Sequence, residues 1–148
     1  MRHTRVIAVV LVGSAIALLL AQKAHAPTQT NTPSVILAGE TILVDIADTP
    51  ELRERGLSGR ESLPEERGML FVFPEEGLHR FWMKDMRFSI DILWISPDQR
   101  IVHIEKSVAP ETYPESFGPD ESARYVLEVP AGYVETLGVH EGDRVRFQ

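Results

Sequence analysis

The segment at residues 79–95, HRFWMKDMRFSIDILWI, constrains the fold of this chain most strongly. Its aromatic and aliphatic residues have the character of a core strand, yet the segment also contains Lys84 and Asp91. A charge that is buried without a partner costs several kcal/mol, comparable to the stability margin of a small domain. We therefore expect both charges to be buried and to be satisfied by the fold or by a ligand, which makes this segment a candidate site.

The first 26 residues have the pattern of an export signal. Arg2 and Arg5 precede an uncharged apolar run at residues 6–21, and the small residues Ala24 and Ala26 suit cleavage by signal peptidase. We expect residues 1–26 to be a signal peptide and the domain to be exported, either to the periplasm or outside the cell. The alternative is an uncleaved membrane anchor. We favour cleavage, because the apolar run is just shorter than the roughly 17 to 25 residues that span a bilayer.

The composition narrows the classes of function. The 15 basic residues include Arg2, Arg5 and Lys23, so after cleavage twelve would face 22 acidic residues, a net charge of −10. Such an acidic chain is a poor candidate for nucleic-acid binding, and the arginines between residues 53 and 60 are interleaved with glutamates. The chain has no cysteine, which excludes disulfides, thiolate metal sites, a cysteine nucleophile and a lipid-modified cysteine.

The pattern along the rest of the chain predicts one globular domain at residues 35–148, preceded by a flexible linker at residues 27–34, PTQTNTPS. Thr49 and Pro50 begin a short helix that ends at Gly56, and a second short helix is expected at residues 133–137. Strands are expected at residues 35–46 with a break at Gly39, and at residues 69–73, 90–95, 100–105, 124–129 and 144–147. Residues 90–95 and 100–105 should pair as a hairpin, residues 74–77 should form a turn, and residues 109–122 should form a long loop.

Six motifs resemble the Domain of Unknown Function 192 family. They are GLSGR at residues 56–60, GMLFVF at 68–73, FWMKDM at 81–86, IDILWI at 90–95, YVLEVPAG at 125–132 and GD at 142–143. Two positions depart from the family pattern, which usually has methionine at Ser58 and asparagine at Asp85. The resemblance implies a compact, mostly antiparallel β fold with short helices and no established activity. We therefore expect an α+β domain, barrel-like or sandwich-like, with two short helices.

The expected core follows from the same strands. Seven apolar residues cannot all remain in contact with water if the strands alternate as predicted. They are Leu70, Trp82, Met83, Ile90, Ile92, Trp94 and Val126.

Trp82 and Lys84 are two residues apart and would share one face of a strand. With Arg60 nearby, this arrangement predicts a small pocket with an apolar wall and cations, suited to a polar or anionic ligand. Two other interpretations of Lys84 stay open. Its stem could cover apolar surface while its ammonium reaches water, or it could belong to a buried ion pair.

Asp91 stands between Ile90 and Ile92 and needs a partner if it is buried. We expect Arg60 as that partner, with Arg124 as the second candidate. The pair could be structural or could belong to a functional site, where perturbed carboxylates often collect.

Two classes of function fit these residues. The first is an exported binding or accessory module for a small polar or anionic ligand of the cell envelope, with a pocket around Arg60, Trp82 and Lys84. The second is a hydrolase that uses Asp85 or Asp91 in acid/base chemistry. Joint action of these two carboxylates is not expected, because six residues of one strand would separate them by about 20 Å.

We favour the binding module, because the sequence contains no recognisable nucleophile, metal or cofactor motif. The histidines after the leader, His79, His103 and His140, form neither an HxH nor an HExxH motif. We therefore expect no metal and no cofactor, and contact with a membrane only through an uncleaved leader.

The leader provides the first prediction. N-terminal sequencing of the protein from its native host should give a chain that begins at Pro27, the residue after Ala26. Recovery of the intact leader in the membrane fraction would instead show an anchored protein.

Overall fold

The computed structural model describes residues 32–148, so the predicted signal peptide and most of the predicted linker lie outside the described residues. The strands are β1 (Ser34–Leu37), β2 (Glu40–Ala47), β3 (Arg67–Gly77), β4 (Phe81–Trp82), β5 (Ile90–Ile95), β6 (Ile101–Val108), β7 (Ser116–Phe117), β8 (Ala123–Pro130) and β9 (Val145–Phe147). The helices are α1 (Pro50–Arg55), the 3₁₀ turn η1 (Pro110–Thr112) and α2 (Tyr133–Leu137). No helix within residues 32–148 is long and apolar enough to cross a membrane.

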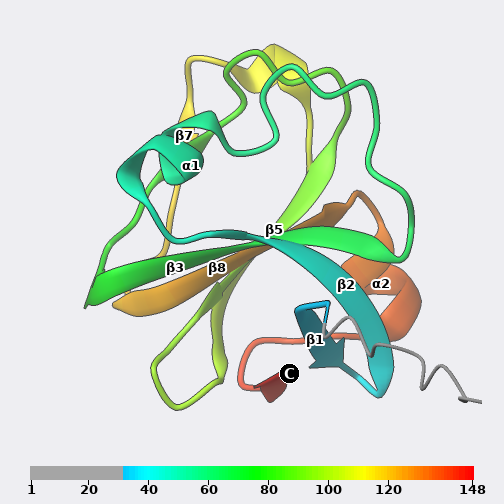
Figure 1. Ribbon diagram of the computed structural model, residues 1–148, viewed down its shortest axis with the longest axis vertical. Helices are drawn as coiled ribbons and strands as arrows, with labels where there is room; N and C mark the ends of the chain where they lie inside the picture. The colour runs from blue at the N-terminus through cyan, green and yellow to red at the C-terminus, as the bar shows by residue number, and fades with distance from the viewer. Residues whose placement is uncertain (1–31) are drawn as a thin grey trace, which may run out of the picture. The chain divides into compact units, whose positions relative to one another are not determined.

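Seven strands form one curled sheet in the order β6-β5-β8-β3-β2-β1-β9. Its neighbouring strands are antiparallel except for β2 and β3, which run parallel. The two edges of the sheet meet at one end, where Arg100 and Arg144 form a bridge and the Val145 amide donates to the Gln99 carbonyl at 2.9 Å. The sheet therefore curls into a partly closed barrel, which confirms the expected α+β, barrel-like fold (Figure 1).

The central strands β5, β8 and β3 carry a hydrophobic cluster on each face. Leu70, Leu93 and Leu127 belong to the cluster that also includes Val134 of α2. Phe71 and Trp94 belong to the second cluster, against which side chains of α1 and of the segment around β4 pack. Figure 1 shows α1 and β7 on one side of these strands, and β1 and the C-terminal strand on the other. Both faces of the central strands are therefore covered.

Several local predictions are confirmed. The Thr49 hydroxyl accepts a hydrogen bond from the Leu52 amide at 3.3 Å and so caps α1, which ends at Gly56 with a positive φ of 49°. Strands β5 and β6 pair as the predicted antiparallel hairpin. The predicted turn at residues 74–77 is wrong, because β3 continues through Gly77. The pairing of Gly77 with Ala123 extends this strand past a bulge.

The segment at residues 79–95 is not one strand. Strand β4 ends at Trp82, and β5 begins only at Ile90. Asp85 adopts a left-handed conformation with φ of 56°, which interrupts the extended run and suits Asp or Asn better than most residues. The burial predicted for two residues is therefore wrong, since Trp82 is 53% exposed and Lys84 is also exposed.

The other expected core residues are buried: Leu70, Met83, Ile90, Ile92, Trp94 and Val126. Within the predicted long loop, β7 pairs with β4 through Phe81–Phe117 and Trp82–Ser116. This two-stranded sheet positions the segment around β4 over the central strands.

Ile92 tests the packing of these central strands. The residue is fully buried, so Ile92→Ala should lower the free energy of unfolding by about 2 to 5 kcal/mol, measured by chemical denaturation. Leu78→Ala is the matched control, because Leu78 is 59% exposed and should change stability little. An effect of Ile92→Ala below about half a kcal/mol would place β5 at the surface.

Candidate functional site

Glu128 lies at the centre of the sheet. In β8 it stands opposite Met69 of β3 on one side and Ile92 of β5 on the other. Alternation places it on the same face as Val126, which belongs to the cluster covered by α1 and the β4 segment. Glu128 is only 5% exposed, and its Oε2 atom has no hydrogen-bond partner among the described residues.

Burial determines the protonation of this carboxyl. Removal from water raises the pKa of Glu128 to about 8, and the positive charge of Arg60 opposes this shift only in part. The group is therefore mostly protonated at neutral pH. A buried polar group without a partner costs stability, so Glu128 has an unsatisfied requirement that a ligand could meet.

A cavity of about 290 Å³ lies beside Glu128. Its lining comprises Arg53, Glu54, Arg55, Gly56, Leu57, Ser58, Phe71, Phe73, Arg80, Phe81, Trp82, Met86 and Glu128. Leu57, Phe71 and Glu128 are buried, whereas Arg55, Arg80 and Trp82 are exposed. The cavity thus has a buried floor with a carboxyl group and an exposed rim with two cations and an indole.

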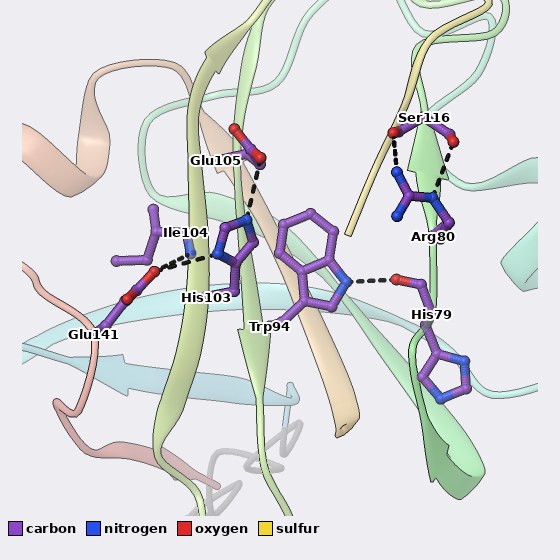
Figure 2. A network of polar contacts seen from close by, with 8 residues as sticks. All are labelled: His79, Arg80, Trp94, His103, Ile104, Glu105, Ser116 and Glu141. Carbon is purple, nitrogen blue, oxygen red and sulfur yellow. Dashed lines mark hydrogen bonds and ion pairs between the residues drawn. The ribbon is translucent and has the colours of Figure 1, made fainter. Parts of the chain in front are cut away.

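Aromatic contacts build one wall of the cavity. The Phe81 ring stands perpendicular to Phe71 at 4.8 Å between centroids and perpendicular to Trp94 at 5.9 Å. The Trp94 indole nitrogen donates to the His79 carbonyl at 2.7 Å, as Figure 2 shows. This hydrogen bond attaches the chain just before β4 to the central strand β5. The position of Phe81 is therefore fixed by packing and by hydrogen bonding.

The arginines of the lining differ in how their side chains are held. Arg53 donates to the carbonyls of Asp48 and Val72 at 2.7 and 2.8 Å. Arg80 donates through Nε to the Ser116 hydroxyl at 3.0 Å, and also to the Ser116 carbonyl (Figure 2). Arg55 makes no side-chain hydrogen bond or ion pair with the described residues. It is the cation at the rim that is most available to a ligand.

The structure brings together only some of the residues predicted for the site. Trp82 lines the cavity. The Lys84 ammonium lies 6.0 Å from the centre of the Trp82 indole ring, but β4 ends at Trp82, so the two residues do not share one strand face as predicted. Lys84 is not part of the lining. Asp85 is exposed beside a separate open depression, and its carbonyl accepts from the Gly59 amide at 2.9 Å. The Ser58 hydroxyl donates to the Lys84 carbonyl at 2.8 Å, which joins these two loops.

The predicted partnership of Arg60 with Asp91 is wrong. Arg60 forms an ion pair with Asp45 at 2.8 Å, and Arg67 binds the other oxygen of Asp45 at 2.7 Å. The second candidate, Arg124, donates to the Phe73 carbonyl at 3.4 Å. Asp91 pairs in register with Val129, so it lies on the opposite face of the sheet from Glu128.

Backbone amides satisfy Asp91 instead. Its Oδ1 atom accepts from Ser107 at 2.8 Å and Gly132 at 3.2 Å, and its Oδ2 atom accepts from Val134 at 2.9 Å. The carboxylate is fully buried and joins β5 to the end of β6 and the start of α2. Its role in this structure is architectural.

His103 belongs to another polar group. Its ring nitrogens lie 3.1 Å from Glu105 and 3.3 Å from Glu141, as Figure 2 shows. Glu141 also accepts from the Ile104 amide at 3.2 Å, so this group ties β6 to the chain before β9. Within residues 32–148 no group of three or more potential side-chain ligands could hold a metal ion.

Sequence reasoning missed Glu128, although a signal was present. Glu128 of the YVLEVPAG motif lies two residues after Val126, so strand alternation places it on a face that is already expected to be in the core. That is the same argument that singled out Asp91. The arginines of the rim had no such signal, because Arg53 and Arg55 look like the solvated face of a helix and Arg80 like a strand flank.

Residues 32–148 form a small barrel-like α+β domain in which the buried Glu128 carboxyl lies beside a cavity of about 290 Å³. The DUF192 family model, described as "Uncharacterized ACR", matches residues 34–147. The chain therefore belongs to the DUF192 family, as its six motifs predicted.

The chain is similar in sequence to UPF0127 proteins of Thermococcus species. One from Thermococcus gammatolerans is 35% identical over 109 residues, which cover 70% of this chain and 65% of the relative. Another from Thermococcus kodakarensis is 31% identical, over 70% of this chain and 64% of its own length. The chain thus spans a little under two thirds of the length of these relatives.

Two crystal structures share the fold. A Sinorhizobium meliloti 1021 protein, described provisionally as a transcription regulator, has a TM-score of 0.72 and 34% identity. The match covers 78% of this chain and 91% of that protein. A protein of unknown function from Novosphingobium aromaticivorans has a TM-score of 0.71 and 26% identity, with 77% and 82% covered.

Asp91→Asn tests the architectural role of this carboxylate. An amide has one acceptor oxygen, and its NH₂ group would face a backbone donor, so the free energy of unfolding should fall by about 1 to 3 kcal/mol. The exposed Asp120→Asn is the control and should change little, measured by the same denaturation experiment. Equal stability of the two variants would contradict the hydrogen bonds assigned to Asp91.

Glu128→Gln tests the buried acid. As pH rises from about 5 to 8, the unfolded chain loses the Glu128 proton while the folded protein keeps it, so wild type should lose stability relative to Glu128→Gln. The expected slope is at most about 1.4 kcal/mol per pH unit. Denaturation curves at several pH values measure this difference, and other titrating groups cancel because both proteins contain them. Parallel pH profiles for the two proteins would show that Glu128 titrates normally.

Proposed function

We propose that this chain is an exported module that binds a small ligand in the cavity beside Glu128. The observation that carries the proposal is the buried Glu128 residue, which lines the cavity and whose Oε2 atom has no hydrogen-bond partner among the described residues. Folding leaves this group unsatisfied at a cost in stability. A ligand that supplies the missing hydrogen bond recovers that cost on binding.

The lining supports binding of an organic molecule. Apolar and aromatic walls with a few polar groups at defined places are typical of small-molecule sites. Here the apolar contacts come from Leu57, Phe71 and Phe81. The polar groups are the buried carboxyl of Glu128 and the exposed guanidinium of Arg55. Trp82 is also part of this lining. Arg60 acts from outside the lining, through its charge near Glu128.

Hydrolysis by Asp85 or Asp91 is less well supported. The Asp91 oxygens accept three backbone hydrogen bonds on the other face of the sheet, and Asp85 lies outside the cavity. The Ser58 hydroxyl lines the cavity but donates to the Lys84 carbonyl. Within the described residues, the cavity lacks a nucleophile held by a base, so the arrangement favours binding.

One relative carries a functional description that differs from this proposal. The provisional description of the Sinorhizobium protein as a transcription regulator would imply contact with nucleic acid if it applied here. Against this, the chain has a net charge of −7, and Arg60 and Arg67 are already paired with Asp45. Export is proposed from the signal-like residues 1–26 and depends on the N-terminal sequencing described above.

A thermal-shift screen of small metabolites tests the proposal. A ligand of the cavity should raise the melting temperature of the wild-type protein with the logarithm of its concentration. Trp82→Ala should weaken this stabilisation, because Trp82 lines the cavity and its exposure makes the variant stable enough to compare.

Lys84→Ala is the matched control, because the Lys84 ammonium lies 6.0 Å from the centre of the Trp82 indole while Lys84 is not part of the lining. A compound that raises the melting temperature of Lys84→Ala as it does that of wild type, but no longer raises that of Trp82→Ala, supports binding in the cavity. Hits that respond only to Lys84→Ala, or the absence of any hit sensitive to Trp82, would contradict it.

A further inference from the structure

We propose that the cavity takes a small aromatic acid of the hydroxyaryl carboxylate class, with its hydroxyl group at Glu128 and its carboxylate at the arginines of the rim. This inference rests on the proposed function and specifies the chemistry and the orientation of the ligand.

The size of the cavity limits the ligand. A volume of about 290 Å³ lies at the lower end of the range for small-molecule sites. It therefore suits a molecule with a single ring. Phe71 and Phe81 both line the cavity, and aromatic side chains favour contact with another aromatic ring.

The floor of the cavity selects the group at the inner end of the ligand. A protonated carboxyl both donates and accepts hydrogen bonds, whereas an ionised one only accepts. A phenolic hydroxyl can donate and accept, so it suits Glu128 in either state. An ammonium suits only the ionised form, and a ligand carboxylate suits only the protonated form. The positive charge of Arg60 near Glu128 also disfavours an ammonium at this end of the cavity. The Arg60 guanidinium itself is held by Asp45 in an ion pair.

The rim selects the group at the outer end. Arg55 and Arg80 are exposed at the rim, and Arg53 is half buried beside them, against the single acid Glu54. Arg55 has no side-chain partner among the described residues. Guanidinium groups bind carboxylates with paired hydrogen bonds, so the excess of arginines favours an anion at this end.

Calorimetric titration of the full-length protein with four probes tests the inference. The probes are 4-hydroxyphenylacetate, phenylacetate, 4-(2-hydroxyethyl)phenol and tyramine. We expect 4-hydroxyphenylacetate to bind about tenfold more tightly than phenylacetate, which lacks the hydroxyl. It should also bind about tenfold more tightly than 4-(2-hydroxyethyl)phenol, which lacks the carboxylate. Tyramine, with a cation at that end, should bind most weakly.

Two variants assign each preference to its residue. Glu128→Leu removes the buried carboxyl and should abolish the preference for 4-hydroxyphenylacetate over phenylacetate. Arg55→Gln should reduce the preference for 4-hydroxyphenylacetate over 4-(2-hydroxyethyl)phenol. Arg146→Gln is the control for charge, because Arg146 is exposed on β9 and outside the lining. It should leave both preferences unchanged.

The outcomes separate this inference from the proposed function. If 4-hydroxyphenylacetate does not bind, or if tyramine or the neutral probe binds more tightly, the ligand class is wrong. Unchanged preferences in Glu128→Leu or Arg55→Gln would overturn the orientation. In each case, hits of the metabolite screen that depend on Trp82 would still support a binding cavity, whereas a screen without such hits would reject both.

Discussion

The central strands β5, β8 and β3 are covered on both faces, and this double burial governs the chemistry of the domain. Any polar side chain on these strands must find a partner or carry a cost in stability. Asp91 finds three backbone amides on one face. Glu128 lies on the other face, where its Oε2 atom has no partner among the described residues. The two acids look alike in sequence, but their surroundings give them different roles.

The arginine distribution explains why Glu128 stays unpaired. Asp45 holds both Arg60 and Arg67, so the Arg60 charge that acts on Glu128 is already in an ion pair and opposes the rise of the Glu128 pKa only in part. The arginines of the lining stay toward the rim of the cavity, where water solvates their charges. Polar requirements therefore remain at both ends of an apolar cavity. This pattern distinguishes a binding site from a packing defect, which would be lined by apolar groups alone.

Much of the fold could be predicted from the sequence, because its signals are local. The Thr49 cap, the β5–β6 hairpin and the apolar alternation of β8 each depend on residues close in the chain. The candidate site was less predictable. Strand periodicity predicts burial of Trp82 and Lys84, but the positive φ of Asp85 breaks the strand and both side chains are exposed. Likewise, the sequence does not show that Arg60 and Asp91 lie on different sides of the sheet.

The most direct test of this account is a carbon-13 NMR titration of the Glu128 side-chain carboxyl, assigned with the Glu128→Gln variant. The account predicts a titration midpoint near 8, well above the ordinary value of 4.5. It also predicts that a ligand of the cavity shifts this signal, because the ligand contacts the carboxyl. A midpoint near 4.5 would contradict it, since the group would then be solvated or paired and would have no requirement for a ligand.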